Sequence, residues 1–146
     1  MKLKQLTMTI AALCVAASAA AAPGAPKLGM VYDAGGKFDK SFNQSAFEGL
    51  QRFTKETGIK VFEVQANSDT QAEQVMRGLA RKKVDMIAAI GFSQTQAVQK
   101  VAKEFPDVNF GIVDMVVELP NVRSILFKEQ EGSYIVGKLA AMASET

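Results

Sequence analysis

The sequence has no histidine and only one cysteine, Cys14, which lies in the apolar segment near the amino terminus. The rest of the chain therefore lacks the usual nitrogen and sulfur ligands of zinc and has no possible internal disulfide. It also lacks the Cys/His and Ser/His pairs that activate nucleophiles. It contains neither a G-x-G-x-x-G fingerprint nor a phosphate-binding P-loop. We therefore expect no metal, no cofactor and no enzymatic activity.

An excess of basic residues is also missing. Lys2 and Lys4 account for both units of the formal net charge of +2, so the remainder carries no net charge. This argues against a nucleic-acid partner. The 48% hydrophobic content, without a low-complexity tract, instead predicts a folded domain with a real core.

Residues 1–22 have the pattern of a secretory signal peptide. A basic start, MKLK, precedes an apolar run over Leu6–Val15 and a stretch of small residues. The apolar run is too short to remain as a membrane-spanning helix. Cleavage after Ala20 or Ala21 fits the small-residue rule, which predicts a periplasmic product with no membrane insertion after cleavage.

A lipid anchor on Cys14 is the alternative to a free periplasmic product. Leu13 precedes this cysteine, at a position where a lipoprotein signal needs a small residue. Processing at Cys14 would also cut the apolar core of the leader in half. The free product is therefore the favoured interpretation.

After the leader, strand and helix patterns alternate, which predicts an α/β fold with a parallel sheet and right-handed crossovers. We expect strands at 28–32, 60–65, 85–90, 110–113 and 122–127. Apolar stripes that start at Phe42, Ala72 and Ala97 predict three helices. The first helix ends at Gly58 and the third ends before Pro106, and a fourth helix is expected at 131–143.

The segment 33–49, DAGGKFDKSFNQSAFEG, joins the first strand to the first helix. Its two adjacent glycines allow a tight turn, and Asp39 or Ser41 can cap the helix that begins near Phe42. In open α/β sheets, ligands bind at the carboxyl ends of the strands. This segment is therefore the first candidate for a binding site.

Two carboxylates occupy equivalent places in the predicted sheet. Asp33 ends the first strand, and Asp114 ends the fourth, in FGIVDM. Each can accept hydrogen bonds from the hydroxyls of a polyol. Alternatively, each satisfies turn amides or caps a helix.

Two further elements face the same edge. Phe42 belongs to an apolar stripe typical of a core residue, yet its place in the first helical turn directs it toward the strand edge. After the third strand, Gly91 permits close approach of a ligand, and Phe92 is a candidate lining residue. Ser93 with Gln96 predicts a capping box for the third helix.

The segment DAGGKFDKSFNQSAFEG resembles the signature of the basic membrane protein family of ABC-transporter solute-binding proteins, whose characterised members bind purine nucleosides. The resemblance implies a type I periplasmic-binding-protein-like fold with two lobes. Residues 23–146 would be the amino-terminal lobe, and the second lobe would be absent. A fragment or truncated gene product is expected, with a natural one-lobe protein as the alternative.

The same resemblance implies roles for individual residues. Asp33 and Asp114 would contact the nucleoside, Phe42 would stack on the purine, and Asn43 would bond a polar edge. Gly91 and Phe92 complete the expected ligand-binding set, and the membrane permease of an ABC importer is the implied partner. A periplasmic sensing lobe is the alternative function, followed by a hydrolase that uses Asp33 and Asp114 as acid and base.

Overall fold

The computed structural model describes residues 24–145, so the predicted signal peptide and Cys14 lie outside the described part. The described chain alternates strands with helices, as expected from the sequence. The elements are β1 Leu28–Tyr32, α1 Phe42–Thr57, β2 Val61–Gln65, α2 Asp69–Arg81, β3 Met86–Ile90, the 3-10 turn η1 Phe92–Gln94, α3 Thr95–Glu104, β4 Asn109–Val113, β5 Val122–Ile125 and α4 Glu129–Ala143. The predicted bounds of β1 are confirmed at both ends, whereas β5 ends two residues earlier than predicted.

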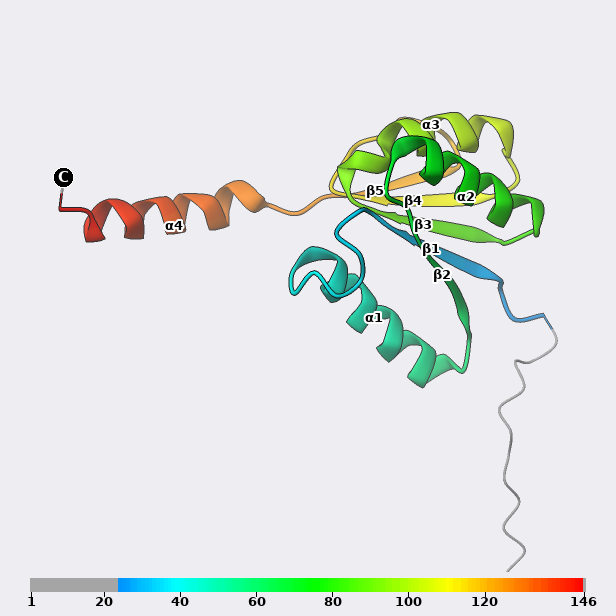
Figure 1. The fold of residues 1–146 in the computed structure, drawn as a ribbon, viewed down its shortest axis with the longest axis horizontal. Coiled ribbons are helices and arrows are strands. Elements are labelled where there is room, and N and C mark those ends of the chain that lie inside the picture. Colours follow the sequence, from blue (N-terminus) through cyan, green and yellow to red (C-terminus); the bar gives the residue numbers. More distant parts are fainter. Residues whose placement is uncertain (1–23, 146) are drawn as a thin grey trace, which may run out of the picture.

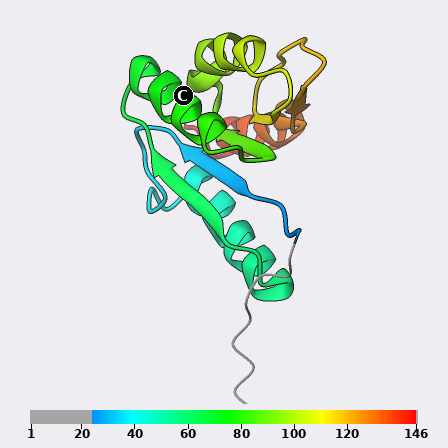
Figure 2. The same ribbon diagram turned by 90° about the vertical axis from the view of Figure 1, so that its right-hand side faces the viewer.

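The strands form one parallel sheet in the order β2-β1-β3-β4-β5. The chain passes from β1 to β2 through α1 on one face, and then returns through α2 and α3 on the other (Figures 1 and 2). The direction of winding therefore reverses between β1 and β3, which is the place where ligands bind in open α/β sheets. This confirms the predicted α/β fold with a parallel βαβ sheet.

All five strands end at the same level. Tyr32 pairs with both Gln65 and Ile90, Ile90 pairs with Val113, and Val113 pairs with Ile125. The next residues along β1, β3 and β4 are Asp33, Gly91 and Asp114, which consequently lie along one edge of the sheet.

The face covered by α2 and α3 holds the hydrophobic core. β-branched and aromatic side chains of the strands are fully buried against apolar residues of the two helices, including Val31, Ile87, Phe110, Ile112, Met76, Val98 and Val101. Salt bridges join these two helices on their outer side. They link Glu73, Arg77, Lys100 and Glu104, and Arg77 Nε lies 2.7 Å from Glu104 Oε2. This face of the sheet is therefore buried beneath α2 and α3.

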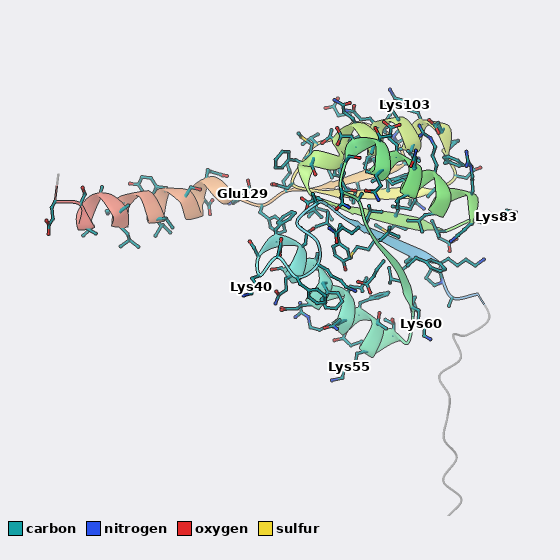
Figure 3. All side chains as sticks on the ribbon, in the orientation of Figure 1. Lys40, Lys55, Lys60, Lys83, Lys103 and Glu129 are labelled. Atoms are coloured by element: carbon teal, nitrogen blue, oxygen red, sulfur yellow. The ribbon has the colours of Figure 1, made fainter. Side chains whose placement is uncertain are left out.

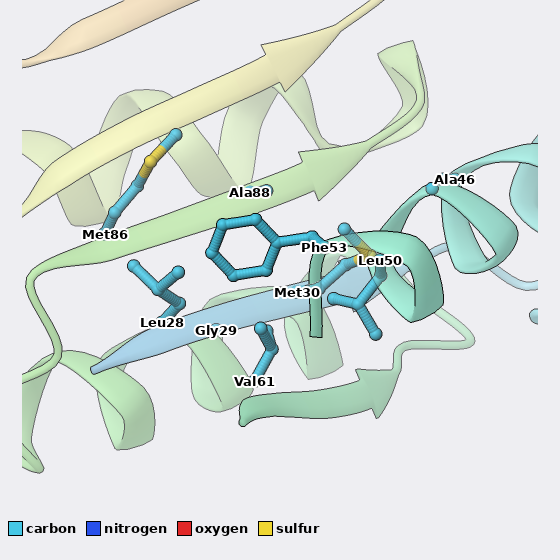
Figure 4. A pocket seen from close by; sticks show the side chains of 10 residues that line it. Leu28, Gly29, Met30, Ala46, Leu50, Phe53, Val61, Met86 and Ala88 are labelled. Carbon is cyan, nitrogen blue, oxygen red and sulfur yellow. The ribbon is translucent and has the colours of Figure 1, made fainter. Parts of the chain in front are cut away.

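The opposite face is covered less completely, because α1 is the helix that packs there. An apolar cavity of about 300 Å³ remains between α1 and the sheet (Figure 4). Leu50 and Phe53 of α1 face Leu28, Met30 and Met86 of the strands across it. Part of the sheet on this side is therefore open to solvent.

Helix α4 projects away from the sheet, and its side chains extend into open space (Figures 1 and 3). Every residue of α4 is exposed, including the apolar Ile135, Val136, Leu139 and Met142. Among residues 24–145, no helix is both long and apolar enough to cross a membrane. The predicted fourth helix is thus confirmed as a helix, and it adds nothing to the core.

Candidate functional site

The loop after β1 is a tight turn built on Asp33. The Gly36 amide donates to the Asp33 carbonyl at 3.0 Å, and the Gly35 amide donates to Asp33 Oδ1 at 2.9 Å. Gly36 has a positive φ of 66°, and a Cβ placed there would lie 2.7 Å from Gln65 Oε1. A side chain at position 36 would therefore be strained by the left-handed backbone and would displace the Gln65 amide.

Asp39 and Ser41 were the two expected caps of α1, and Asp39 is the one that caps it. Its Oδ1 accepts from the Ser41 and Gln44 amides at 2.9 and 3.1 Å, and its Oδ2 accepts from the Asn43 amide at 3.0 Å. Desolvation raises the pKa of Asp39, but these amide bonds together outweigh it and hold the pKa below its usual value. Asp39 therefore serves as the structural anchor of the loop.

Asn43 connects the two carboxylates of the loop. Its Nδ2 donates to Asp33 Oδ1 at 2.7 Å and to Asp39 Oδ2 at 3.1 Å, and the residue is only 1% exposed. Within residues 24–145, Asn43 Oδ1 has no hydrogen-bond partner. The burial and the contact with Asp33 give Asn43 a positioning role beneath the edge of the sheet.

Asp33, Phe42 and Gly91 lie together where the winding reverses. A Cβ built on Gly91 would lie 3.0 Å from Asp33 Oδ2 and 3.5 Å from Phe42 Cε1, and Gly91 has a φ of 107°. Among the residues from 24 to 145, none donates a hydrogen bond to Asp33 Oδ2. Asp33 Oδ2 is therefore available to accept a hydrogen bond next to the half-buried ring of Phe42.

The structure separates Phe42 from the apolar residues that follow it on α1. Ala46, Leu50 and Phe53 line the apolar cavity, whereas Phe42, in the first turn, lies against Gly91. Phe42 is half-buried, so the packing is compatible with both of its expected roles.

The loop after β3 differs from the expectation. The predicted capping box of Ser93 and Gln96 is wrong, because η1 intervenes and α3 begins at Thr95, whose hydroxyl donates to the Phe92 carbonyl. Phe92 is 63% exposed at the edge of the sheet. It is thus accessible to a ligand, although it makes no part of the Asp33 network.

Gln94, in the same loop, is a structural residue that the sequence reasoning missed. It is 2% exposed, and its Nε2 donates at 2.9 Å to the carbonyls of both Val31 and Ile90. It therefore ties β1 to β3 at the point where the winding reverses. The only signal in the sequence was its position just before the apolar stripe of α3.

Asp114 lies on the same edge, but β3 separates its strand from β1. Two strand spacings place the backbones of Asp33 and Asp114 about 10 Å apart. Asp114 has a left-handed φ of 72°, and its amide donates to the Ile125 carbonyl at 2.8 Å. A hydrogen bond with Asp114 raises the pKa of Glu129, which lies at the root of α4 (Figure 3).

Known proteins that match this chain include binding components of ABC transporters. A model of the family described as "ABC transporter substrate-binding protein PnrA-like" matches residues 26–146. The chain is 38% identical to the ABC transporter nucleoside-binding protein BmpA of Lactococcus lactis, over 82% of this chain and 36% of that one. It is 33% identical to an uncharacterized lipoprotein of Pyrococcus horikoshii, over 79% of this chain and 29% of that one.

A solved structure agrees with these sequence matches. The crystal structure of a solute-binding protein of an ABC transporter system from Aeropyrum pernix superimposes with a TM-score of 0.70 at 32% identity, covering 77% of this chain and 31% of that one. The chain thus spans about a third of the length of each of these three proteins. By sequence and by fold, it belongs to the Bmp family of PnrA-like ABC-transporter substrate-binding proteins.

Proposed function

We propose that this chain contributes one wall of a site that binds a purine nucleoside for import by an ABC transporter. The observation that carries the proposal is that Phe42 and Asp33 lie within 3.5 Å of the place that a Cβ on Gly91 would take, at the reversal of the winding. An aromatic ring, a carboxylate and an open backbone are the groups that recognise a base and a sugar. The nucleoside-binding relative supports this ligand class.

In this proposal Phe42 offers one ring face to the base. Stacking of a base on an aromatic side chain contributes roughly 1 to 3 kcal/mol and depends little on base identity. The absence of a side chain at Gly91 keeps space next to the ring. Phe92 adds an exposed aromatic ring on the same edge.

The polar contacts come from the two carboxylates and the network beneath them. Asp33 Oδ2 is available to accept a hydrogen bond, while Asn43 and the Gly35 amide hold Oδ1. With about 10 Å between the backbones of Asp33 and Asp114, the two carboxylates would contact different parts of a nucleoside. The buried position of Asn43 favours an indirect role, in which it orients Asp33 for the ligand.

The proposed setting is extracytoplasmic. We propose that residues 1–22 are a cleaved signal peptide, that residues 23–146 form the amino-terminal lobe of a two-lobed site, and that the ligand passes to a membrane permease. A free periplasmic product is proposed over a lipid anchor on Cys14. The mass of the secreted protein tests this, because a diacylated amino terminus at Cys14 would contradict release without lipid.

Titration of the 15N-labelled protein with adenosine, guanosine and free ribose tests the ligand. The expected result is binding of both nucleosides, with shifts of the amides of residues 33–43 and 91–92. The affinity should be weak, because one wall leaves the other face of the base in water. Absence of shifts with both nucleosides up to their solubility would overturn the proposal for this chain.

A further inference from the structure

Edge strand β2 contacts the turn that carries Asp33 from the side opposite to Gly91. In the sheet order, β1 lies between β2 and β3, and Gly91 follows β3. Glu63 and Gln65 stand two residues apart on β2, so their side chains lie on the same face of the sheet. Gln65 pairs in register with Tyr32, the last residue of β1. These two side chains therefore lie next to the start of the Asp33 turn.

The Glu63 carboxylate binds both ends of this turn. Its Oε2 accepts from the Tyr32 hydroxyl at 2.9 Å and from Lys37 Nζ at 3.4 Å. Tyr32 directly precedes the 33–36 turn, and Lys37 directly follows it. Tyr32 is only 1% exposed, and burial, together with the hydrogen bond to Glu63, raises its pKa, so the hydroxyl remains a donor at neutral pH. One carboxylate oxygen thus joins the residues on either side of the turn.

Gln65 contacts the turn between these two ends. Its Nε2 donates to the Ala34 carbonyl at 3.2 Å. Its Oε1 lies 2.7 Å from the place that a Cβ on Gly36 would take. Side chains of β2 therefore contact the turn along its length as well as at its ends.

Lys37 extends the contact from β2 to α1. Its Nζ lies 4.7 Å from the centroid of the Phe47 ring of α1, within the usual range of a cation–π interaction. The Phe47 ring in turn meets the Phe38 ring edge to face, with 5.5 Å between their centroids. The charge of Lys37 is thus shared between Glu63 and an aromatic ring of the helix.

We propose that Glu63 is a positioning residue, which clamps the 33–36 turn and so holds Asp33 in the geometry that binds the ligand. Glu63 acts through Tyr32 and Lys37, because β1 separates β2 from the side of the site where Gly91 lies. Binding groups keep their geometry only when neighbouring side chains fix them. This inference rests on the proposed nucleoside-binding function for its ligand.

The cap of α1 does not depend on this clamp. Asp39 holds the Ser41, Asn43 and Gln44 amides with its own carboxylate. Loss of the clamp should therefore loosen the turn and leave the start of α1 in place.

The first test needs no ligand. The Gly35 and Gly36 amides both donate to Asp33, so their hydrogen exchange in the 15N-labelled protein reports opening of the turn. In Glu63→Gln they should exchange roughly twofold to tenfold faster, as expected when charged hydrogen bonds become neutral. The Ser41 and Gln44 amides at the cap should keep their wild-type rates.

Glu56→Gln, at the exposed end of α1, is the matched control for the loss of one carboxylate. Wild-type exchange of the two glycine amides in Glu63→Gln would overturn the clamp. Faster exchange at all amides, with a lower melting temperature, would make Glu63 a general stabilising residue and would also overturn it.

The second test measures adenosine affinity in variants of Lys37. Lys37→Met should weaken binding by up to about fivefold, as expected for a partly exposed ion pair. Lys37→Arg should restore the affinity, because a guanidinium pairs with a carboxylate and stacks on an aromatic ring. Lys60→Met, at an exposed lysine just before β2, is the control. Combining Lys37→Met with Glu63→Gln should cost less than the sum of the two single losses, and full additivity would contradict the clamp.

The two tests separate the clamp from the proposed function. If the wild type binds no nucleoside, the proposed function fails, whereas faster exchange of the Gly35 and Gly36 amides in Glu63→Gln would retain the clamp on the turn. If the wild type binds adenosine and Glu63→Gln matches it in affinity and exchange, the clamp is rejected and nucleoside binding stands.

Discussion

The two faces of the sheet are held together in different ways. On the α2/α3 face, fully buried side chains such as Phe110 and Ile112 pack against the two helices. On the α1 face, the helix rests partly over an apolar cavity, and its first turn is fixed by the hydrogen bonds of Asp39 and Asn43. Apolar burial therefore provides stability on one face, whereas a polar network positions the candidate site on the other.

The largest expected effect comes from matched truncations on the two faces. Phe110→Ala should lower the free energy of unfolding by about 3 to 5 kcal/mol, because it leaves a cavity in a closed core. Met86→Ala, on the α1 face, should cost less than about 2 kcal/mol, because Met86 is 36% exposed. Urea denaturation of both variants measures the difference, and equal losses would contradict the contrast between the faces.

The second prediction concerns the network under the site. Asn43→Ala removes the buried donor shared by Asp33 and Asp39, so we expect a loss of about 1 to 3 kcal/mol in the free energy of unfolding. Nucleoside affinity should fall as well, because Asp33 loses its support. Gln44→Ala is the control, since the Gln44 side chain bonds to Glu48 on the surface of α1. If Asn43→Ala behaves like this control, the network does not position the site.

Much of the fold could be predicted because its signals are local. The bounds of β1 follow from a short apolar run, and α1 and α3 end at Gly58 and before Pro106, where helix termination is strong. The predicted extension of β5 through Phe127 was wrong because apolar character alone does not imply burial: Leu126 and Phe127 are exposed.

The site was less predictable, because its contacts join distant parts of the chain. Gln94 bonds to the carbonyl of Val31, which is 63 positions away, and a sequence pattern cannot show such a contact. Asp33 and Gly91 were both candidates, but it is the order of the strands that places them next to each other. The Ser93 capping box matched a motif, yet the chain forms a 3-10 turn at that point instead.

The third prediction separates the two roles of Phe42 by comparison with another aromatic of α1. Phe42→Ala should weaken nucleoside binding by roughly 1 to 3 kcal/mol, with only a small change in melting temperature, because the ring is half-buried. Phe53→Ala should leave affinity unchanged, since Phe53 lines the apolar cavity, and because Phe53 is also half-buried its melting temperature gives the reference for loss of such a ring. A sharp fall in melting temperature for Phe42→Ala, with unchanged affinity of the folded protein, would make Phe42 a core residue.

The smallest expected effect is the pH dependence of the cap on α1. The pKa of Asp39 lies below its usual value in the folded protein, because the amide bonds outweigh the desolvation that acts against them. The stability that Asp39 contributes is therefore present above its unfolded pKa of about 3.9 and is lost as the pH falls below that value toward the folded pKa.

Urea unfolding from pH 6 to pH 2.5 measures this loss in the wild type and in Asp39→Asn, which has no carboxyl group to titrate. The pKa values of Glu73 and Glu104 are also lowered, chiefly by hydrogen bonds from Lys100 and Arg77, so both proteins should lose stability in acid. The wild type should lose more, and its advantage over the variant should shrink below about pH 4. Asp107→Asn, which removes an exposed carboxylate beyond α3, controls for the loss of one surface charge. Parallel pH profiles of the wild type and Asp39→Asn would show that the amide bonds of Asp39 do not anchor the start of α1, and the polar network would then need another source of rigidity.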